Sequence, residues 1–368
     1  MVQKAKLVPR KKSRGPRTRP GLREIAKEAN LSITAVSFAL NGTGRLGEET
    51  RKRVRTIAGK LGYRANAHAR NLRRKTSGVL AITASLPAGI VSVLPNMDYF
   101  MGIWRSAMTT ALKRGYMLLL VPFGTEPRAL AEVPVDGGIV IDPVVNDPLV
   151  RHFEGQRLPV VTIGRDLGRG AAKAWWVDND HAALTRAALD HLSERGARRI
   201  GMILAAPKYF YSAAARQTYE EWAIERGMRP LVAEVLAAPT ESAGYEAALR
   251  MLDSPDPPDA VYASLDRFAV GTLFAASKQL LRVPDDLMIV AGDDGANTQT
   301  AQVPITALDL DPGQLGQAAV NLLLDRLEGK LSPRFVLVPG SLRQRASTCR
   351  SVIICGAKMR ESADHALT

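Results

Sequence analysis

From residue 78 almost to the end of the chain, short apolar runs alternate with stretches of helical periodicity. The runs are rich in valine, isoleucine and leucine: GVLAITA, YMLLLVP, GGIVI, PVVTI, RIGMIL, DAVYAS, LMIVAG and PITALDL. Near-continuous apolar strands separated by helices are typical of parallel sheets that carry helices on both faces. This pattern extends over roughly 260 residues, which is more than one sheet comfortably holds. We therefore expect two α/β lobes, with a ligand cleft between them at the carboxyl ends of the strands.

The segment before this region has helical periodicity only. Residues 22–29, 33–41 and 48–63 each place apolar side chains on one helical face. These are Leu22, Ile25, Ala26 and Ala29 in the first, Val36 and Leu40 in the second, and Val54, Ile57, Ala58 and Leu61 in the third. Between the first two helices, Asn30 tolerates a left-handed turn and Ser32 is a suitable N-cap. Two short helices, a tight turn and a bracing third helix predict an all-α helix-turn-helix domain.

The excess positive charge of the chain is confined to its first fifth. Residues 1–77 hold 21 of the 50 lysines and arginines but only 4 of the 36 acidic residues, a balance of +17, and the remainder is at −3. A concentrated basic head indicates nucleic-acid binding, the alternative being a solvated basic tail. The first 19 residues contain eight basic and no acidic residues, so we interpret residues 1–20 as a disordered basic arm.

The sequence argues against several other classes of protein. Residues 1–20 lack the apolar core of a signal peptide, and no run of 18 apolar residues predicts a membrane span. The two cysteines, Cys349 and Cys355, form neither a metal motif nor a disulfide framework, which fits a reducing cytoplasm. Because no nucleophile elbow, phosphate-binding loop or metal cluster is present, we expect no enzyme activity, no cofactor and no metal. The five histidines are scattered, and we interpret them as surface residues.

The head sequence LREIAKEANLSITAVSFALNG, with TRKRVRTIAGKLGYRANAHARNLRR after it, resembles the DNA-binding head of the lactose/galactose repressor (LacI/GalR) family. Downstream motifs follow the family's order, among them PVDGGIVI, VDNDHAALTRAALDHLSERGARRIGMI, DAVYASLDRFAVG and VPDDLMIVAGDD. The similarity covers about residues 21–348. It implies a multidomain protein that begins with a helix-turn-helix domain at 21–64 and a hinge helix at 65–77. A two-lobed, periplasmic-binding-protein-like core for effector binding and dimerisation follows at 78–348, and a C-terminal tail at 349–368.

The resemblance also implies that the segment after the third helix becomes helical on the operator. In the family, one leucine from each subunit inserts between the central base pairs in the minor groove, and Leu72 matches that leucine. Such a wedge costs unstacking energy but bends the duplex so that it contacts more protein. Arg70, Arg73 and Arg74 would contact phosphates or the groove edge, whereas the alternative for Leu72 is packing on the head's own core. Ala65 stands where the family usually has a proline that presets the first turn, so we expect a less preorganised hinge.

The positions that face base edges in the family fall on Ile33, Thr34 and Phe38. Thr34 can hydrogen-bond or contact a thymine methyl, whereas the other two side chains offer apolar contact alone. The alternative for Phe38 is partial packing against the head. Phosphate contacts, which position a protein without specifying sequence, are expected from three further polar residues: Ser32, Ser37 and Asn41.

In the family a small molecule, often a sugar, binds between the lobes and changes the hinges. Five residues match the family's effector positions: Ser85, Tyr99, Phe100, Arg216 and Asp293. Arginine and aspartate together suit a polyol, and the alternative for this pair is a salt bridge across the cleft. Other positions depart from the family: Leu265 replaces an asparagine, Leu310 replaces a glutamine, and no aromatic side chain stands at 239–241. The alternatives to a hexose are a smaller, more apolar or acidic ligand, or no ligand.

Taken together, the resemblance implies a cytoplasmic, nucleoid-associated transcriptional regulator, most often a repressor in this family. It would bind a pseudo-palindromic operator in double-stranded DNA as a homodimer and answer to a small-molecule effector, with no membrane partner. Residues 349–368 lack the heptad repeat that makes tetramers in the family, so a dimer is expected. The alternative is a transport-type solute-binding protein with the same α/β core, against which the basic head and the missing signal peptide argue.

Overall fold

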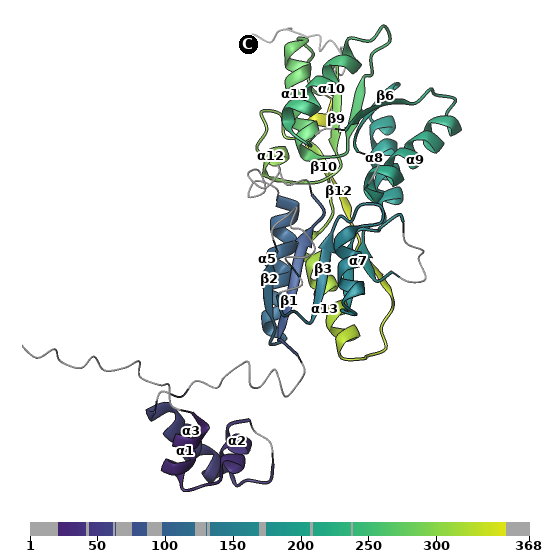
Figure 1. The fold of residues 1–368 in the computed structure, drawn as a ribbon. Coiled ribbons are helices and arrows are strands. Elements are labelled where there is room, and N and C mark those ends of the chain that lie inside the picture. Colours follow the sequence, from purple (N-terminus) through teal and green to yellow (C-terminus); the bar gives the residue numbers. More distant parts are fainter. Residues whose placement is uncertain are drawn as a thin grey trace, which may run out of the picture. The chain divides into compact units, whose positions relative to one another are not determined.

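The computed structural model describes residues 21–41, 44–61, 63, 76–86, 98–121, 130, 133–168, 174–206, 209–236 and 238–350 (Figure 1). The chain divides into two compact units, Met1–Lys75 and Thr76–Thr368. Within the described part, no helix is both long enough and apolar enough to cross a membrane. We describe each unit by itself, with the element labels of Figure 1.

The first unit is a bundle of three helices, α1 (Leu22–Ala29), α2 (Ile33–Asn41) and α3 (Glu48–Lys60). All the apolar side chains that the periodicity placed on inner faces belong to its core or pack against it. Asn30 adopts the expected left-handed conformation with φ 50°, and the Ala35 N–H donates a hydrogen bond to Ser32 Oγ at 3.1 Å. Arg53 Nη2 donates to the Ala29 carbonyl at 2.9 Å, so α3 braces the end of α1. The helix-turn-helix prediction is therefore confirmed.

The second unit consists of two α/β lobes. The first lobe has the strands β1 (Val79–Ala84), β2 (Met117–Leu120), β3 (Gly137–Ile141), β4 (Val160–Ile163), β5 (Trp176–Asp178) and β11 (Phe335–Leu337). Its sheet runs in the order β2-β1-β3-β4-β5-β11 and is parallel throughout. The helices α5 (Asp98–Lys113) and α13 (Pro312–Leu327) cover one face, and α7 (Pro148–Gly155) covers the other.

The second lobe repeats this plan. Its strands are β6 (Ile200–Ala205), β7 (Leu231–Val235), β8 (Ala260–Ala263), β9 (Met288–Ala291), β10 (Thr306–Asp309) and β12 (Ser341–Arg343). The order is β7-β6-β8-β9-β10-β12, parallel except for the edge pair β10 and β12. The helices α10 (Glu241–Leu252) and α11 (Asp266–Lys278) cover one face, while α8 (His181–Glu194) and α9 (Phe210–Glu225) cover the other. The short helices α12 (Ala296–Gln299) and η3 (Ala346–Thr348) complete the lobe.

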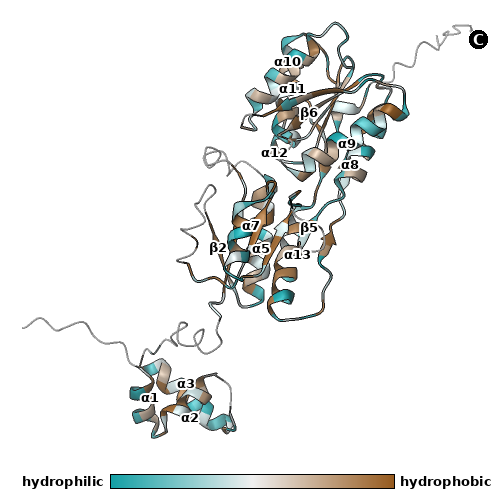
Figure 2. Cartoon of the chain, turned by 45° about the vertical axis from the view of Figure 1, so that its right-hand side comes forward, coloured by the Kyte–Doolittle hydropathy of each residue, from teal (hydrophilic) through white to brown (hydrophobic). Residues whose placement is uncertain are grey.

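The apolar strands other than the edge strand β2 form the interior of each lobe, as their sequences predict. Figure 2 shows the hydrophobic strands enclosed between helices whose outer faces are more polar. All eight expected runs are strands: β1, β2, β3, β4, β6, β8, β9 and β10. Because buried parallel strands need helices on both faces, the two-lobed architecture follows from the alternation in the sequence.

The chain passes between the lobes three times, after β5, after β10 and after β11. The buried side chain of Asn179 joins these crossings, since its amide nitrogen donates to the Leu310 carbonyl at 3.0 Å and the Val338 carbonyl at 2.9 Å. Each of the three residues lies in a different crossing. One amide group therefore ties all three connections together beside the cleft.

Candidate functional site

The exposed side of α2 carries the residues predicted to read DNA. Ile33 and Phe38 are 45% and 42% exposed, large fractions for apolar side chains, and Thr34 is exposed beside them. Ser37 is only 5% exposed, so the structure places its side chain inside the head and away from this surface. The side chain of Asn41 and the hinge residues Arg70, Leu72 and Arg73 lie outside the described residues.

Phe38 has two environments at once. A Cβ atom added at Gly44 would lie 2.8 Å from a carbon of the Phe38 ring, so the ring packs closely on this glycine. Gly44 also has φ +73°, a conformation that side chains other than glycine rarely adopt. One side of the ring is therefore held by the head while the remainder is exposed, and partial packing and apolar contact with DNA are compatible roles.

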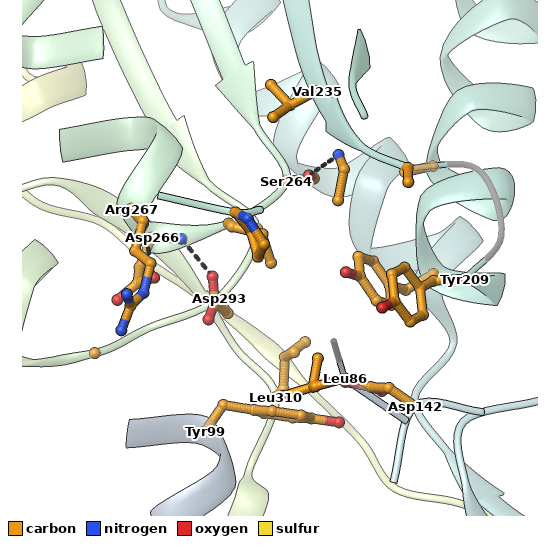
Figure 3. A pocket seen from close by; sticks show the side chains of 18 of the residues that line it. Leu86, Tyr99, Asp142, Tyr209, Val235, Ser264, Asp266, Arg267, Asp293 and Leu310 are labelled. Carbon is orange, nitrogen blue, oxygen red and sulfur yellow. Dashed lines mark hydrogen bonds between the residues drawn. The ribbon is translucent and has the colours of Figure 1, made fainter. Parts of the chain in front are cut away.

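A cavity of about 190 Å³ lies between the two lobes (Figure 3). Its wall is built from residues that follow strands of both sheets: Leu86 after β1, Asp142 after β3, Ala206 after β6, Leu236 after β7, Ser264 after β8, Gly292 after β9 and Leu310 after β10. Parallel strands bring their carboxyl ends to one edge of each sheet. The two sheets present these edges to each other, which is the cleft that the sequence predicts.

Aromatic rings form much of the wall. Tyr209 and Tyr211 stack with ring centroids 5.6 Å apart and an angle of 13° between their planes, and Tyr99 lies across the cavity from Tyr209 in Figure 3. Burial raises the pKa of Tyr99 and of Tyr211 well above the ordinary value, and nearby carboxylates raise it further. These phenols are therefore neutral at physiological pH, and each can donate a hydrogen bond to a ligand.

Carboxyl groups share the wall with the rings. Burial raises the pKa of Asp142 to about 7, the Asp178 charge adds to this rise, and His181 opposes it. Burial and the neighbouring Asp266 likewise hold the pKa of Asp293 well above its ordinary range. Asp293 Oδ1 accepts a hydrogen bond from the Asp266 N–H at 2.5 Å. The cavity thus contains carboxyl groups whose ionised form is disfavoured.

Contacts between the lobes close the cavity on two sides. The Tyr209 hydroxyl donates to the Ser85 carbonyl at 3.2 Å, and Tyr209 also forms an isolated backbone bridge with Val144. Elsewhere Asp98 Oδ2, from the start of α5, accepts the Ala296 N–H at 2.5 Å. Each contact joins a residue of one lobe to a residue of the other. This structure therefore represents a closed arrangement of the lobes.

An arginine adds a third contact between the lobes. The Arg165 guanidinium lies 4.2 Å from the Trp176 ring centroid and 4.3 Å from that of Phe210, with its Nε 3.2 Å from an Asp178 oxygen. Trp176 belongs to β5 in the first lobe, whereas Phe210 begins α9 in the second. Cation–π contacts of this kind are worth about 0.5–2 kcal/mol each, so they help to hold the lobes closed.

The five effector residues expected from the resemblance divide into two groups. Tyr99, Phe100 and Asp293 line the cavity, whereas Ser85 and Arg216 do not. The Ser85 hydroxyl donates to the Asp147 carboxylate, and Arg216 forms ion pairs with Glu220 at 2.8 Å and with Glu234. The structure therefore brings together neither the arginine–aspartate pair that suits a polyol nor the salt bridge proposed as its alternative.

Several residues of the cavity were missed from the sequence. They are Asp142, His181, Tyr209, Tyr211, Tyr262 and Arg267. Asp142 directly follows the strand GGIVI and His181 follows the β5 crossing, so the rule that ligands bind at strand carboxyl ends could have found both. His181 Nε2 lies 3.0 Å from Asp178 Oδ1, and the buried His191 bonds to Thr348 Oγ1 at 2.9 Å. The interpretation of these two histidines as surface residues was therefore wrong.

Across the described residues, no group of three or more His, Cys, Asp or Glu side chains could hold a metal ion. The described residues form two other candidate sites. One is the exposed helix α2 of the basic head, which carries apolar and hydroxyl side chains, and the other is the aromatic, acidic cavity between the two lobes. The first suits a DNA groove and the second suits a small polar molecule.

Two family models match the chain. Residues 21–66 match the model described as bacterial regulatory proteins, lacI family, and residues 189–348 match a periplasmic binding protein-like domain. The matched segments contain the three head helices and most of the second lobe. The match of the head favours a DNA-binding regulator over a transport-type binding protein.

Individual relatives agree with this assignment. The chain is 28% identical over 353 residues to the HTH-type transcriptional repressor PurR of Escherichia coli O139:H28, covering 89% of this chain and 96% of that protein. PurR of Klebsiella pneumoniae is 28% identical over 335 residues, covering 84% and 91%.

Solved structures show the same fold. A transcriptional regulator CelR–cellobiose complex has 26% identity and a TM-score of 0.68, covering 89% of this chain and 100% of that one. The lac repressor dimer bound to operator and the anti-inducer ONPF has a TM-score of 0.77 at 20% identity, covering 90% and 100%. At that identity the second likeness is one of fold alone.

Proposed function

The chain belongs to the LacI family of DNA-binding transcriptional repressors, with an effector-binding core, and from this premise we propose how it acts. Two copies bind one pseudo-palindromic operator, and a small molecule in the cavity between the lobes controls that binding. The proposal places the protein in the cytoplasm, on the nucleoid.

The observation that carries this proposal is the cavity shared by the two lobes. Tyr209 contacts Ser85, and Asp98 contacts Ala296, across the cleft on two sides of the cavity. A molecule that occupies the cavity touches both lobes and so has a different affinity for closed and open arrangements. A ligand shifts an equilibrium by its differential affinity for the two states, which makes the lobes the switch.

The dimer is supported by apolar side chains that a monomer would leave in water. Met101, Met108 and Leu112 of α5, Met117 and Leu120 of β2, and Phe274 of α11 are all exposed. In Figure 1, α5 and β2 of the first lobe and α11 of the second lie toward the same side of the core. Scattered exposed apolar residues are ordinary, but a set spread along one side fits an interface between two copies.

On the operator, α2 of each head occupies the major groove. Ile33, Thr34 and Phe38 contact base edges, since all three are exposed on one helix. The remaining DNA contacts fall on phosphates and on the minor groove. They come from Ser32, Ser37, Asn41, Arg70, Leu72 and Arg73, of which Ser37 would need to leave its buried position.

In the cavity, Tyr99, Phe100 and Asp293 contact the effector directly. Ser85 and Arg216 act at a distance, through Asp147 and through the two glutamates that pair with the arginine. The structurally similar CelR complex holds cellobiose, a disaccharide.

The experiment that tests the proposal is the selection of duplexes bound by the full-length protein from a random pool. We expect an inverted repeat with a flexible pyrimidine–purine step at its centre, because paired hinges kink such steps most easily. Thr34→Ala should relax the preference at one position in each half-site, and Leu72→Ala should weaken the preference at the centre. Binding that is only unspecific and strongly salt-sensitive, for the unchanged protein, would overturn the proposal.

A further inference from the structure

Among the described residues of the cavity wall, carboxyl groups outnumber cationic side chains. Four aspartates line it, Asp98, Asp142, Asp266 and Asp293, against one arginine, Arg267, and one histidine, His181. Each uncompensated charge in such a place is costly, because water is largely displaced from around it. The wall of the cavity therefore favours ligands that bring positive charge.

Two of the four carboxyl groups are already satisfied by the protein. Asp98 accepts the Ala296 N–H at 2.5 Å, and Asp266 accepts the Arg267 N–H at 2.7 Å. Arg267 lowers the pKa of Asp266 against the larger effect of burial, and it also lowers that of Asp293. His181 is likewise committed to Asp178, whose oxygen lies 3.0 Å from its ring nitrogen.

The other two carboxyl groups have fewer hydrogen-bond partners. Within the described residues, no hydrogen bond joins the Asp142 carboxyl group to another side chain, and Asp293 is held by a single backbone N–H at its Oδ1. Burial is the largest cause of the raised pKa of both. In Figure 3 they lie on different sides of the cavity, with Tyr99 between them at its lower edge. A ligand in the cavity therefore meets one of these groups on either side.

The aromatic walls favour a cation as well. The face of an aromatic ring is electronegative and attracts an ammonium group within about 6 Å. The stacked Tyr209 and Tyr211 and the ring of Tyr99 present such surfaces to the cavity. Among the described lining residues, an acidic ligand would meet only Arg267 as a fixed positive partner, because Arg216 does not line the cavity. A neutral polyol can form hydrogen bonds with these carboxyl groups in their protonated form, whereas an ammonium group also forms an ion pair with their ionised form.

From these contacts we propose that the effector is a small cyclic compound that carries a protonated amine, with the ammonium group bound by Asp142 or Asp293 and a ring packed against the tyrosines. The inference rests on the proposed function, because it names the chemistry of the effector in that same cavity. Of the alternatives that the sequence leaves open, it disfavours an acidic ligand.

The test uses the full-length protein and matched probes that differ only in charge. Each of three ring frameworks is tested as an amine, as a neutral compound and as an acid. The cyclohexane set is cyclohexylamine, cyclohexanol and cyclohexanecarboxylate, and the benzene set is benzylamine, benzyl alcohol and benzoate. The sugar set is glucosamine, glucose and glucuronate. Binding is measured by calorimetry without DNA. We expect the amine of at least one framework to bind about tenfold or more tightly than its neutral partner, and the acids to bind most weakly. If no amine exceeds its neutral partner, the proposal is overturned.

Two isosteric variants locate the binding. Asp142→Asn and Asp293→Asn remove a charge and keep the shape, and at least one should weaken amine binding about tenfold while leaving the alcohol unchanged. Glu246→Gln, an exposed carboxylate of α10 outside the cavity, is the matched control and should change neither. Equal amine binding by all three variants would show that the amine binds elsewhere and would overturn the assignment. Because DNA is absent, failure here is distinct from failure of the operator selection.

Discussion

Asp142 combines an unusual backbone with an unusual charge environment. Its φ of 47° lies in the left-handed region, where asparagine and aspartate are the best tolerated residues after glycine. Burial, and then the charge of Asp178, raises its pKa to about 7 against the opposing effect of His181. The phenols of Tyr99, Tyr209 and Tyr211 also interact with its charge. Asparagine therefore replaces it with little backbone strain and removes only the ionisation.

This environment predicts a pH-dependent effect of Asp142→Asn on the ligand-free protein. Between the ordinary pKa of about 4 and the folded value of about 7, the folded protein retains a proton that the unfolded chain releases, so the wild type loses stability as the pH rises. The variant lacks this loss. We therefore expect Asp142→Asn to raise the free energy of unfolding relative to the wild type, as measured with urea. This increase should be larger at about pH 8 than at about pH 5 by about 1–3 kcal/mol.

Glu246→Gln provides the control for this measurement, since its carboxylate is exposed on α10 and does not line the cavity. It should change stability by no more than about 0.5 kcal/mol at either pH. A gain from Asp142→Asn that is the same at both pH values would contradict a buried, protonated Asp142, and a loss at the higher pH would do so more strongly.

At the scale of elements, the three crossings between the lobes depend on one amide. Asn179 is 1% exposed and donates both of its N–H groups, to Leu310 and to Val338. Asn179→Ala leaves two carbonyls without these donors, and an unsatisfied buried group costs about 1–3 kcal/mol. The free energy of unfolding should therefore fall by about 2–4 kcal/mol, as measured by urea denaturation.

A second variant at the same position distinguishes lost donors from lost volume. Asn179→Asp keeps the shape but presents only acceptors to the two carbonyls, so it should destabilise at least as much as the alanine variant. Gln217→Ala, which removes an exposed amide from α9, should be nearly neutral. A stable Asn179→Asp protein would show that the two hydrogen bonds contribute little.

Burial separates most of the strands that sequence reasoning found from those it missed, with the edge strand β2, which was found, and the short buried strand β5, which was missed, as exceptions. Strands such as β3 and β9 are buried at every position and give continuous apolar runs. The strand β7 contains Glu234 and is mostly half-buried, and β11 and β12 are three-residue edge strands with exposed ends, so none of them gives such a run. An apolar run in the sequence indicates a buried strand. Strands at the edge of a sheet are less buried, so most of them give no such run.

The same limit applies to the cavity. Its position at the strand carboxyl ends was predictable, because topology alone brings those ends together. The exclusion of Arg216 was not, because it depends on Glu220 and on Glu234, which lies 18 residues further along the chain on β7. Competition between partners on neighbouring elements is a property of packing in three dimensions, which a single sequence does not record.

At the scale of the whole molecule, control of DNA binding requires that the lobes and the partner subunit share a surface. Exposed apolar side chains lie on both lobes, with Leu112 of α5 at 57% and Phe274 of α11 at 56%. A dimer held through both lobes would transmit a change in lobe closure to the spacing of its two heads. Such coupling requires a two-state element that both sites bias, and in the proposed mechanism the opening and closing of the lobes is that element.

This arrangement predicts which surface changes separate the subunits. Leu112→Glu and Phe274→Glu each place a charge in the proposed interface, so both should shift the protein from dimer to monomer in sedimentation velocity and weaken operator binding. Ile224→Glu is the matched control, because Ile224 is 72% exposed on α9, which Figure 1 shows on the opposite side of the core from α5. It should leave both the dimer and operator binding intact. If the control dissociates the dimer while the other two variants do not, the interface lies on the α9 side, and the lobes would have to signal through a different surface.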